Sequence, residues 1–179
     1  MKEFNAPKIG SRFSFKGFDW ITLDRTEDGG VLAIMDGCWK EIPFDDKRDY
    51  TNNYAKSTLR KTLREELLPI LGEENLLPHV VDLVADNGDD SYGTVTDKVF
   101  ILSCDEYRQH RQHIPLLDEW SWTCTPWWID PNTGIGYNVR HIGPAGILDY
   151  YDALSSGGVA PACVFNLSSL QGVSTCKPD

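Results

Sequence analysis

With 27 acidic against 17 basic side chains in 179 residues, this chain carries a formal net charge of −10, which argues against a nucleic-acid-binding protein. The basic residues near Arg108 and Arg111 are interleaved with acidic ones, so we expect no basic stripe. Hydrophobic residues make up 41%, and no apolar run approaches about 18 residues. We therefore predict one globular domain over residues 1–179, without a membrane span.

The amino-terminal segment and the cysteines predict the compartment. Residues 1–7 hold no apolar stretch, so we expect no signal peptide and a cytoplasmic location on synthesis. The five cysteines are an odd number at wide spacing, without a Cys-x-x-Cys pair. We interpret them as free, buried thiols in a reducing environment.

The first part of the chain has the pattern of a β-hairpin. Strands are predicted at residues 9–15, 18–23 and 31–35. Asp28-Gly29-Gly30 is a strong turn signal between the second and third of these runs. Residues 40–53 are polar and contain Pro43, so we predict a loop there.

The middle of the chain predicts two helices. Leu59, Leu63 and Leu67 lie four residues apart, which places them on one helical face after a cap at Ser57 or Thr58. We expect Pro69 and Gly72 to end this helix near Leu68. The second helix is predicted over residues 105–113, with Ser103 as its cap and Glu106 completing a capping box.

Between and after the helices the chain is β-like. Further strands are predicted at residues 79–84, 98–102 and 159–165, with a surface loop over 86–93. Beyond Pro115 the sequence is aromatic and rich in turn residues. The predicted fold class is α+β: an N-terminal β-hairpin, two helices and irregular C-terminal β structure.

Four regions, in order, resemble one protein family. They read FDWITL at 18–23, STLRKTL at 57–63, DKVFILSCDE at 97–106, and WTCTP with GVAPA at 122–126 and 158–162. In order and spacing, over roughly residues 9–167, they resemble an uncharacterised bacterial and prophage domain family of gut Firmicutes. The chain departs from the family at Thr123-Cys124, where members commonly carry Leu-Arg, and at Ala160, where they often carry Arg.

This resemblance implies a C-type-lectin-like fold of the sulfatase-modifying-factor branch. Some proteins of that branch are the variable binding products of diversity-generating retroelements, which vary the residues just before the last strands. The resemblance therefore implies a ligand-binding module, with no catalytic residue, metal or cofactor. Its prophage members add a virion location as an alternative to the cytoplasm.

The candidate binding residues lie in an aromatic stretch near the carboxyl end. Four of the six tryptophans fall within nine residues, and three tyrosines follow. The candidates are Trp120, Trp122, Trp127, Trp128, Tyr137, Asp149, Tyr150, Tyr151 and Asp152. Trp and Tyr supply rigid contact area and dominate binding hot spots, so we predict that residues 118–157 display a surface for a protein or glycan. The alternative is that these rings fill the core.

Within this stretch the spacing indicates where single rings point. Trp120 and Trp122 share a strand face, whereas the adjacent Trp127 and Trp128 point to opposite faces. Residues 149–152 are expected in a loop flanked by glycine and serine. The sequence indicates no oligomeric state.

Other candidate sites have simpler interpretations. The acidic stretch 86–90 and the Asp130-Pro131-Asn132 turn are interpreted as solvated turns rather than calcium ligands. His110 and His113 are expected on an exposed helix face rather than as a metal pair.

Two alternative functions stay open. One is a structural or accessory phage protein without a dedicated ligand. The other is a copper-dependent oxidase like the fold relatives that generate formylglycine, which would require Cys124 and Cys163 to meet in the fold.

Overall fold

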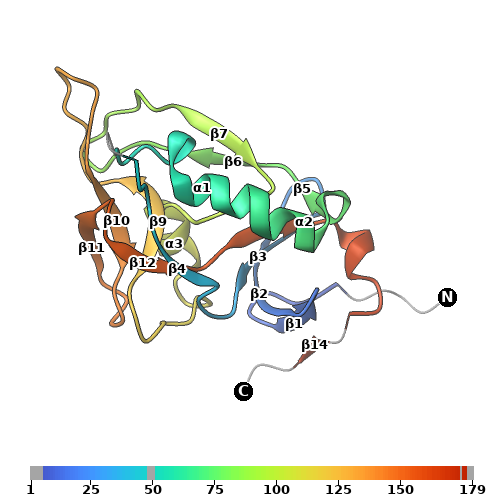
Figure 1. The fold of residues 1–179 in the computed structure, drawn as a ribbon. Coiled ribbons are helices and arrows are strands. Elements are labelled where there is room, and N and C mark those ends of the chain that lie inside the picture. The colour runs from blue at the N-terminus through green and yellow to red at the C-terminus, as the bar shows by residue number, and fades with distance from the viewer. Residues whose placement is uncertain (1–5, 48–50, 174, 177–179) are drawn as a thin grey trace.

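Two β-sheets and a two-stranded ribbon form the framework of the computed structural model, which describes residues 6–47, 51–173 and 175–176 (Figure 1). The structure is α+β, as the sequence predicts. None of the helices in these residues has the length and hydrophobicity needed to cross a bilayer.

The first sheet joins strands from both ends of the chain. Its order is β14-β1-β2-β3-β13-β5, and β8 also pairs with β13. The strands are β1 (Arg12–Phe15), β2 (Phe18–Arg25), β3 (Val31–Met35), β5 (Leu76–Leu77), β8 (Val99–Phe100), β13 (Ala162–Phe165) and β14 (Thr175–Cys176). The predicted hairpin is confirmed, because β1, β2 and β3 are antiparallel neighbours.

The second sheet has the order β11-β10-β9-β12-β4. Its strands are β4 (Lys40–Pro43), β9 (Ser121–Pro126), β10 (Asn138–Ile142), β11 (Leu148–Asp152) and β12 (Ser156–Val159). β12 runs parallel to β9, and the other neighbouring pairs are antiparallel. The ribbon consists of β6 (His79–Asp82) and β7 (Thr94–Asp97).

The helical segments cover the sheets (Figure 1). They are η1 (Tyr54–Lys56), α1 (Thr58–Thr62), η2 (Leu63–Leu67), α2 (Leu68–Leu71), η3 (Glu73–Asn75), α3 (Cys104–His110) and η4 (Leu167–Leu170). α1, η2 and α2 follow one another without a break, and η2 is a π-helical turn within them.

Aromatic rings fill the core beside the first sheet. The ring centroids of Phe13, Phe15 and Trp20 lie 4.9 to 5.4 Å from that of Phe165 on β13. All four side chains are at most 9% exposed. Edge-to-face packing of this kind adds to the free energy gained by removing the rings from water.

The leucine stripe of the first helix is confirmed and extends one turn further than predicted. Leu59, Leu63, Leu67 and Leu71 are fully buried. Residues four apart drift by about 40° per step around an ideal α-helix. The wider π turn of η2 takes up part of this drift, so all four leucines keep facing the core.

The expected end of this helix near Leu68 is wrong. The helix runs through Pro69 and ends at Leu71. It is capped by Gly72, whose φ of +80° is a conformation that favours glycine. Proline lacks an N–H and clashes with the carbonyl of an α-helix four residues before it. Here the Leu68 N–H reaches the carbonyl of Leu63, five residues back, which widens the helix just before the proline.

The second helix begins as predicted. Ser103 and Glu106 form a reciprocal capping box, and the helix ends at His110 rather than at residue 113. The expectation of an exposed histidine face is wrong for His110, which is 6% exposed, and burial lowers its pKa. Glu106 also accepts a hydrogen bond from His79 at 2.7 Å, which joins this helix to β6.

Two segments predicted as loops are strands. Lys40–Pro43 forms β4 and pairs with β12, whose residues are about 115 positions away in the chain. Residues 149–152 lie in β11 and pair with β10. Neither segment alternates apolar and polar residues in its own sequence, so only the distant partner strand reveals them.

The last predicted strand, 159–165, is two strands in two different sheets. β12 ends at Val159 and β13 begins at Ala162. Pro161 between them cannot donate to a ladder, and its carbonyl accepts a hydrogen bond from Met35 N at 2.8 Å. Residues 156–165 therefore contribute strands to both sheets.

A buried ion pair holds the first helix against the ribbon. Arg60 Nε and Nη2 donate to the two carboxylate oxygens of Asp97 at 2.7 and 2.9 Å. The side chain of Asp97 is 3% exposed and that of Arg60 is 17% exposed. Since the pair is bidentate and shielded, removing one partner leaves a charge buried without its counterion.

Replacing Arg60 by Met is therefore expected to lower the free energy of unfolding by about 3 kcal/mol, because Asp97 loses its counterion. Urea denaturation measures this. Lys61→Met is the matched control, because Lys61 is exposed and lies 3.9 Å from its partner Glu65, and its change should stay below about 1 kcal/mol. Equal effects of the two substitutions would contradict the role of the pair.

Candidate ligand-binding surface

The predicted aromatic residues gather around β9, β10 and β11. In the register of these strands Tyr151 lies opposite Val139, and Tyr150 lies opposite Arg140. Successive side chains of a strand point to opposite faces. Tyr150 and Tyr151 therefore face opposite sides of the sheet, and the candidates divide into two groups.

The first group, the Trp120 cluster, consists of Trp120, His141 and Tyr151. The Trp120 ring centroid lies 4.7 Å from that of His141 and 5.6 Å from that of Tyr151. Trp120 is half-buried, and Tyr151 is 52% exposed. The cluster therefore has a packed base and an exposed tyrosine.

Trp122 supports this cluster from the core and does not contribute to the surface. It is 2% exposed and packs edge-to-face against Trp120 at 4.6 Å. Its indole N–H donates to the carbonyl of Ile42 at 3.1 Å, and its ring also contacts Phe44. Trp120 and Trp122 do lie on one side of the sheet, as their spacing predicts, but only Trp120 reaches solvent.

A glycine on the neighbouring strand makes room for the cluster. A β-carbon at Gly157 of β12 would lie 2.3 Å from the ring of Trp120 and 2.9 Å from Trp122 Nε1. Real side chains do not approach so closely, so this position requires glycine.

His141 sits in the cluster as a neutral imidazole. It is 8% exposed, and its Nδ1 is buried without a hydrogen-bond partner among the described residues. Burial lowers the pKa of His141; the nearby Asp149 opposes this and Arg140 reinforces it. Its ring therefore behaves as an aromatic packing group at neutral pH.

The second group, the Trp127 stack, lies on the other face. The rings of Trp127 and Tyr150 are nearly parallel, with centroids 3.9 Å apart and an interplanar angle of 12°. Arg140, on the same side, forms an ion pair with Asp86. Tyr150 is 41% exposed, whereas Trp127 is half-buried beneath it.

Trp128 and Tyr137 stand at the base of the loop between β9 and β10, which projects beyond the sheets (Figure 1). They are 43% and 52% exposed. Trp127 and Trp128 therefore differ in burial, as their adjacent positions predict, although both follow the end of β9.

A buried asparagine that the sequence did not reveal fixes this loop. Asn52 Nδ2 donates to the carbonyls of Trp128 and Asn138 at 2.9 and 2.8 Å, and the Tyr92 hydroxyl donates to its Oδ1 at 2.9 Å. A β-carbon at Gly136 would lie 2.4 Å from Asn52 Nδ2. In sequence Asn52 is one polar residue in a polar segment, so no local pattern indicates its role.

The two acidic candidates cap the ends of β11. Asp149 is exposed and accepts a hydrogen bond from the N–H of Tyr150 at 2.8 Å. Asp152 is half-buried and accepts one from the N–H of Leu154 at 2.8 Å. Both carboxylates therefore stabilise local backbone while bordering the exposed tyrosines.

The candidates for metal binding do not converge. Among the described residues no group of three or more His, Cys, Asp or Glu side chains is placed to hold a metal ion. The carboxylates of Asp89 and Asp130 accept backbone N–H groups of Ser91 and Asn132 within their own turns.

The thiols are free where their side chains are described. Cys104, Cys124 and Cys163 are buried, but Cys38 is exposed, so the expectation of buried thiols is wrong for Cys38. The side chain of Cys176 lies outside the described residues. Burial raises the pKa of Cys124 and Cys163 well above the ordinary value, which disfavours the thiolate that copper binds. Cys124 lies in β9 and Cys163 in β13, which belong to different sheets.

Gly157→Ala is expected to displace the Trp120 ring and to lower the free energy of unfolding by about 1–3 kcal/mol, as overpacking does. Denaturation and tryptophan fluorescence together measure this. Gly143→Ala is the matched control, because its nearest neighbour would lie 3.5 Å away, at ordinary contact distance. A wild-type fluorescence spectrum in Gly157→Ala would contradict the packing described above.

Acid is expected to destabilise the fold in part through His141. Burial lowers the pKa of His141 in the folded state, so on acidification the unfolded chain binds a proton at this histidine at a higher pH than the folded chain does. The contribution of His141 to the free energy of unfolding is therefore fully present above about pH 6.5 and declines below that pH. This slope is at most about 1.4 kcal/mol per pH unit. Urea denaturation across pH 5 to 8 should give a shallower slope for His141→Phe than for wild type. A wild-type slope in His141→Phe would show that His141 does not cause the acid destabilisation. His110→Phe measures separately the contribution of the other buried histidine whose pKa is lowered.

Comparison with known proteins finds no matching family model, no matching curated protein and no matching solved structure.

Proposed function

We propose that the chain is a binding module that docks a protein ligand on its aromatic surface. The aromatic surface comprises the exposed large hydrophobic side chains between residues 128 and 154. They are Trp128, Ile135, Tyr137, Ile147, Tyr150, Tyr151 and Leu154. The proposal includes the finer fold assignment, a C-type-lectin-like domain of the sulfatase-modifying-factor branch, which is supported by the segment resemblance and by the α+β architecture.

The concentration of exposed apolar side chains carries the proposal. Twelve large hydrophobic side chains are exposed among the described residues, and seven of them belong to this surface. Exposed hydrophobic side chains scattered singly over a surface are ordinary, whereas their concentration around one edge strand favours an interaction site. Tyr and Trp in this group lose few rotamers on binding, because each has only two side-chain torsions.

The position of the surface favours a protein over a glycan. β11 is an edge strand of the second sheet, and its two tyrosines face opposite sides. The aliphatic side chains Ile147 and Leu154 flank the strand and are 67% and 45% exposed. Aliphatic and aromatic side chains mixed in this way are typical of protein interfaces.

The exposed rings rest on other packed side chains. The Trp127 stack holds Tyr150, the Trp120 cluster holds Tyr151, and Asn52 fixes the backbone at Trp128. A surface whose rings are already packed loses little entropy on docking, which favours affinity. The acidic residues Asp149 and Asp152 border it and favour a partner with basic residues at the rim.

Selection from a displayed protein-domain library, with the wild-type chain as bait, tests the proposal. Enriched binders should lose at least about tenfold in affinity for Tyr151→Ser and Tyr150→Ser, because hot-spot rings contribute more than about 1.4 kcal/mol each. Val80→Ser is the matched control, since Val80 is 60% exposed on β6, outside the surface.

Three results would contradict the proposal. Binders whose affinity falls as much for Val80→Ser as for the tyrosine variants would show nonspecific hydrophobic binding. Binding on a glycan array, without domain binders, would favour a glycan ligand. If neither the domain library nor the glycan array yields a binder, an accessory protein without a dedicated ligand is favoured.

A further inference from the structure

Basic side chains of this acidic chain converge on one hollow beside the first helix. The hollow has a volume of about 390 Å³. Five of the 17 basic residues line it, together with one acidic residue, Glu65. This basic pocket is defined by Lys47, Lys56, Arg60, Lys61 and Arg64.

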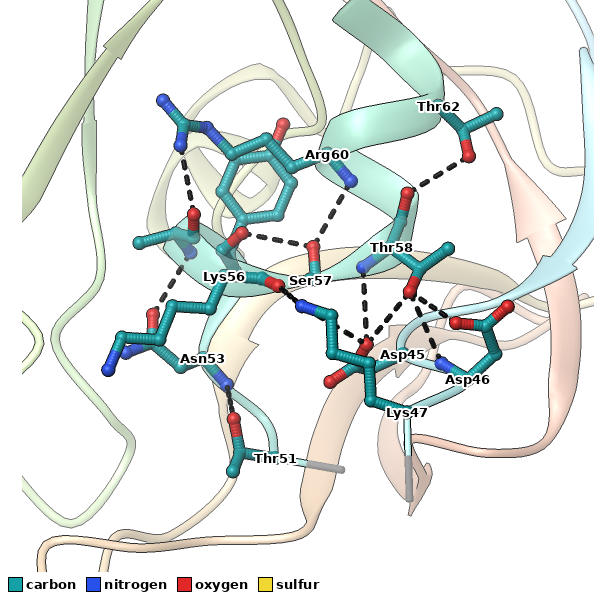
Figure 2. A network of polar contacts seen from close by, with 12 residues as sticks. Asp45, Asp46, Lys47, Thr51, Asn53, Lys56, Ser57, Thr58, Arg60 and Thr62 are labelled. Atoms are coloured by element: carbon teal, nitrogen blue, oxygen red, sulfur yellow. Dashed lines mark hydrogen bonds and ion pairs between the residues drawn. The ribbon is translucent and has the colours of Figure 1, made fainter. Parts of the chain in front are cut away.

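The cations come from three consecutive segments. Lys47 precedes η1, Lys56 ends η1, and the other three lie on the first two turns of the helix that starts at Thr58. Figure 2 shows the side chain of Lys47 extending to the end of η1, where its ammonium donates to the carbonyl of Lys56. The fold therefore places the tip of one lysine against the backbone of another.

Some of these charges are already balanced. Arg60 is held by Asp97 in the buried pair described above. Lys47 and Lys61 lie 3.9 Å from the carboxylates of Asp45 and Glu65, the outer limit for an ion pair. Counting Asp97, Asp45, Glu65 and the neighbouring Asp46, which accepts a hydrogen bond from the Thr58 hydroxyl, against the five cations leaves a net charge of about +1. This contrasts with −10 for the whole chain.

Two of the five cations, Lys56 and Arg64, are the ones that no carboxylate holds. Both side chains are exposed, and neither has an ion-pair partner among the described residues. A bound anion would supply the counter-charge that these two side chains lack.

The start of the helix is not itself the binding group. Asp45 Oδ1 accepts from the N–H and the hydroxyl of Thr58 at 3.3 and 2.9 Å, and Ser57 Oγ accepts from Arg60 N at 3.1 Å (Figure 2). These backbone donors are therefore occupied. An anion in the pocket must be recognised by the lysine and arginine side chains.

We propose that the basic pocket binds a small, multiply charged phosphate-bearing molecule, with Lys56 and Arg64 as its main contacts. Its volume lies in the range of small-molecule sites. Arginine and lysine are the residues that recognise phosphate oxygens. A long polyanion fits less well, since the acidic surface beyond the pocket would repel it.

An adjoining hollow gives such a ligand room for a second, uncharged part. It has a volume of about 260 Å³ and shares Lys47 and Lys56 with the basic pocket. Its other lining residues are the polar Asp45, Thr51 and Asn53, the half-buried Tyr92 and, from the loop between β9 and β10, Gly134 and Ile135. The ligand class is therefore a phosphate group attached to a larger, uncharged body with both polar and apolar parts.

Calorimetric titration of the full chain with tripolyphosphate, beside inorganic phosphate and sulfate, tests this inference. We expect saturable binding of tripolyphosphate that weakens with added salt. Affinity should be at least about tenfold lower for inorganic phosphate and sulfate, which carry fewer negative charges than tripolyphosphate. Lys56→Gln and Arg64→Gln should each weaken tripolyphosphate binding by at least about tenfold, as expected for a lost charged hydrogen bond.

Lys8→Gln is the matched control, because Lys8 is an exposed lysine that does not line the basic pocket. The Lys8→Gln variant should bind tripolyphosphate with wild-type affinity. Circular dichroism should show that every variant is folded. The inference is overturned if wild type gives no saturable heat, if sulfate binds as well as tripolyphosphate, or if Lys8→Gln weakens binding as much as Lys56→Gln.

Discussion

One continuous stretch, residues 156–165, ties the two sheets together. β12 lies between β9 and β4 in the second sheet, and after Ala160 and Pro161 the chain enters the first sheet as β13. Val159 and the four residues of β13 are at most 1% exposed. Since each sheet places one of these strands between two others, neither can be completed until the carboxyl end of the chain has folded in.

The aromatic surface depends on this stretch. Gly157 on β12 leaves the space that Trp120 occupies, and Trp122 links the same region to Ile42 on β4. Tyr151 rests on Trp120, so the exposed ring is positioned by residues that are themselves buried. A hydrophobic core that continues to the surface in this way supplies rigid contact area without a dedicated loop structure.

Charge is separated across the fold. The second sheet presents tyrosines bordered by Asp149 and Asp152, whereas the first helix gathers five cations around one hollow. The helix can carry this charge because the buried pair of Arg60 and Asp97 anchors it to β7 and the leucine stripe anchors it to the core. The two proposed sites are centred on different elements, and among the residues assigned to them only Ile135 belongs to both, so variants at the other residues test them separately.

The sequence by itself determined the elements whose signals are local. The hairpin follows from alternation around a glycine turn, the first helix from its leucine spacing, and the start of α3 from a capping box within four residues. The density of Trp and Tyr also pointed to the right part of the chain for exposed rings. Each of these depends on neighbours a few residues apart, so their pattern is visible along the chain.

Only the tertiary structure decided which rings face solvent and where charges meet. β4 and β11 are strands because other segments of the chain pair with them. The sequence predicts one strand over residues 159–165, whereas in the structure Pro161 lies between β12 and β13, which belong to different sheets. Contacts between segments that are not neighbours in the chain decide four features of the proposed sites. These are the burial of Trp122, the opposite directions of Tyr150 and Tyr151, the hydrogen bonds of Asn52, and the meeting of Lys47 with Arg64. Local propensity carries no information on such contacts, because their free energy comes from partners that the local sequence does not contain.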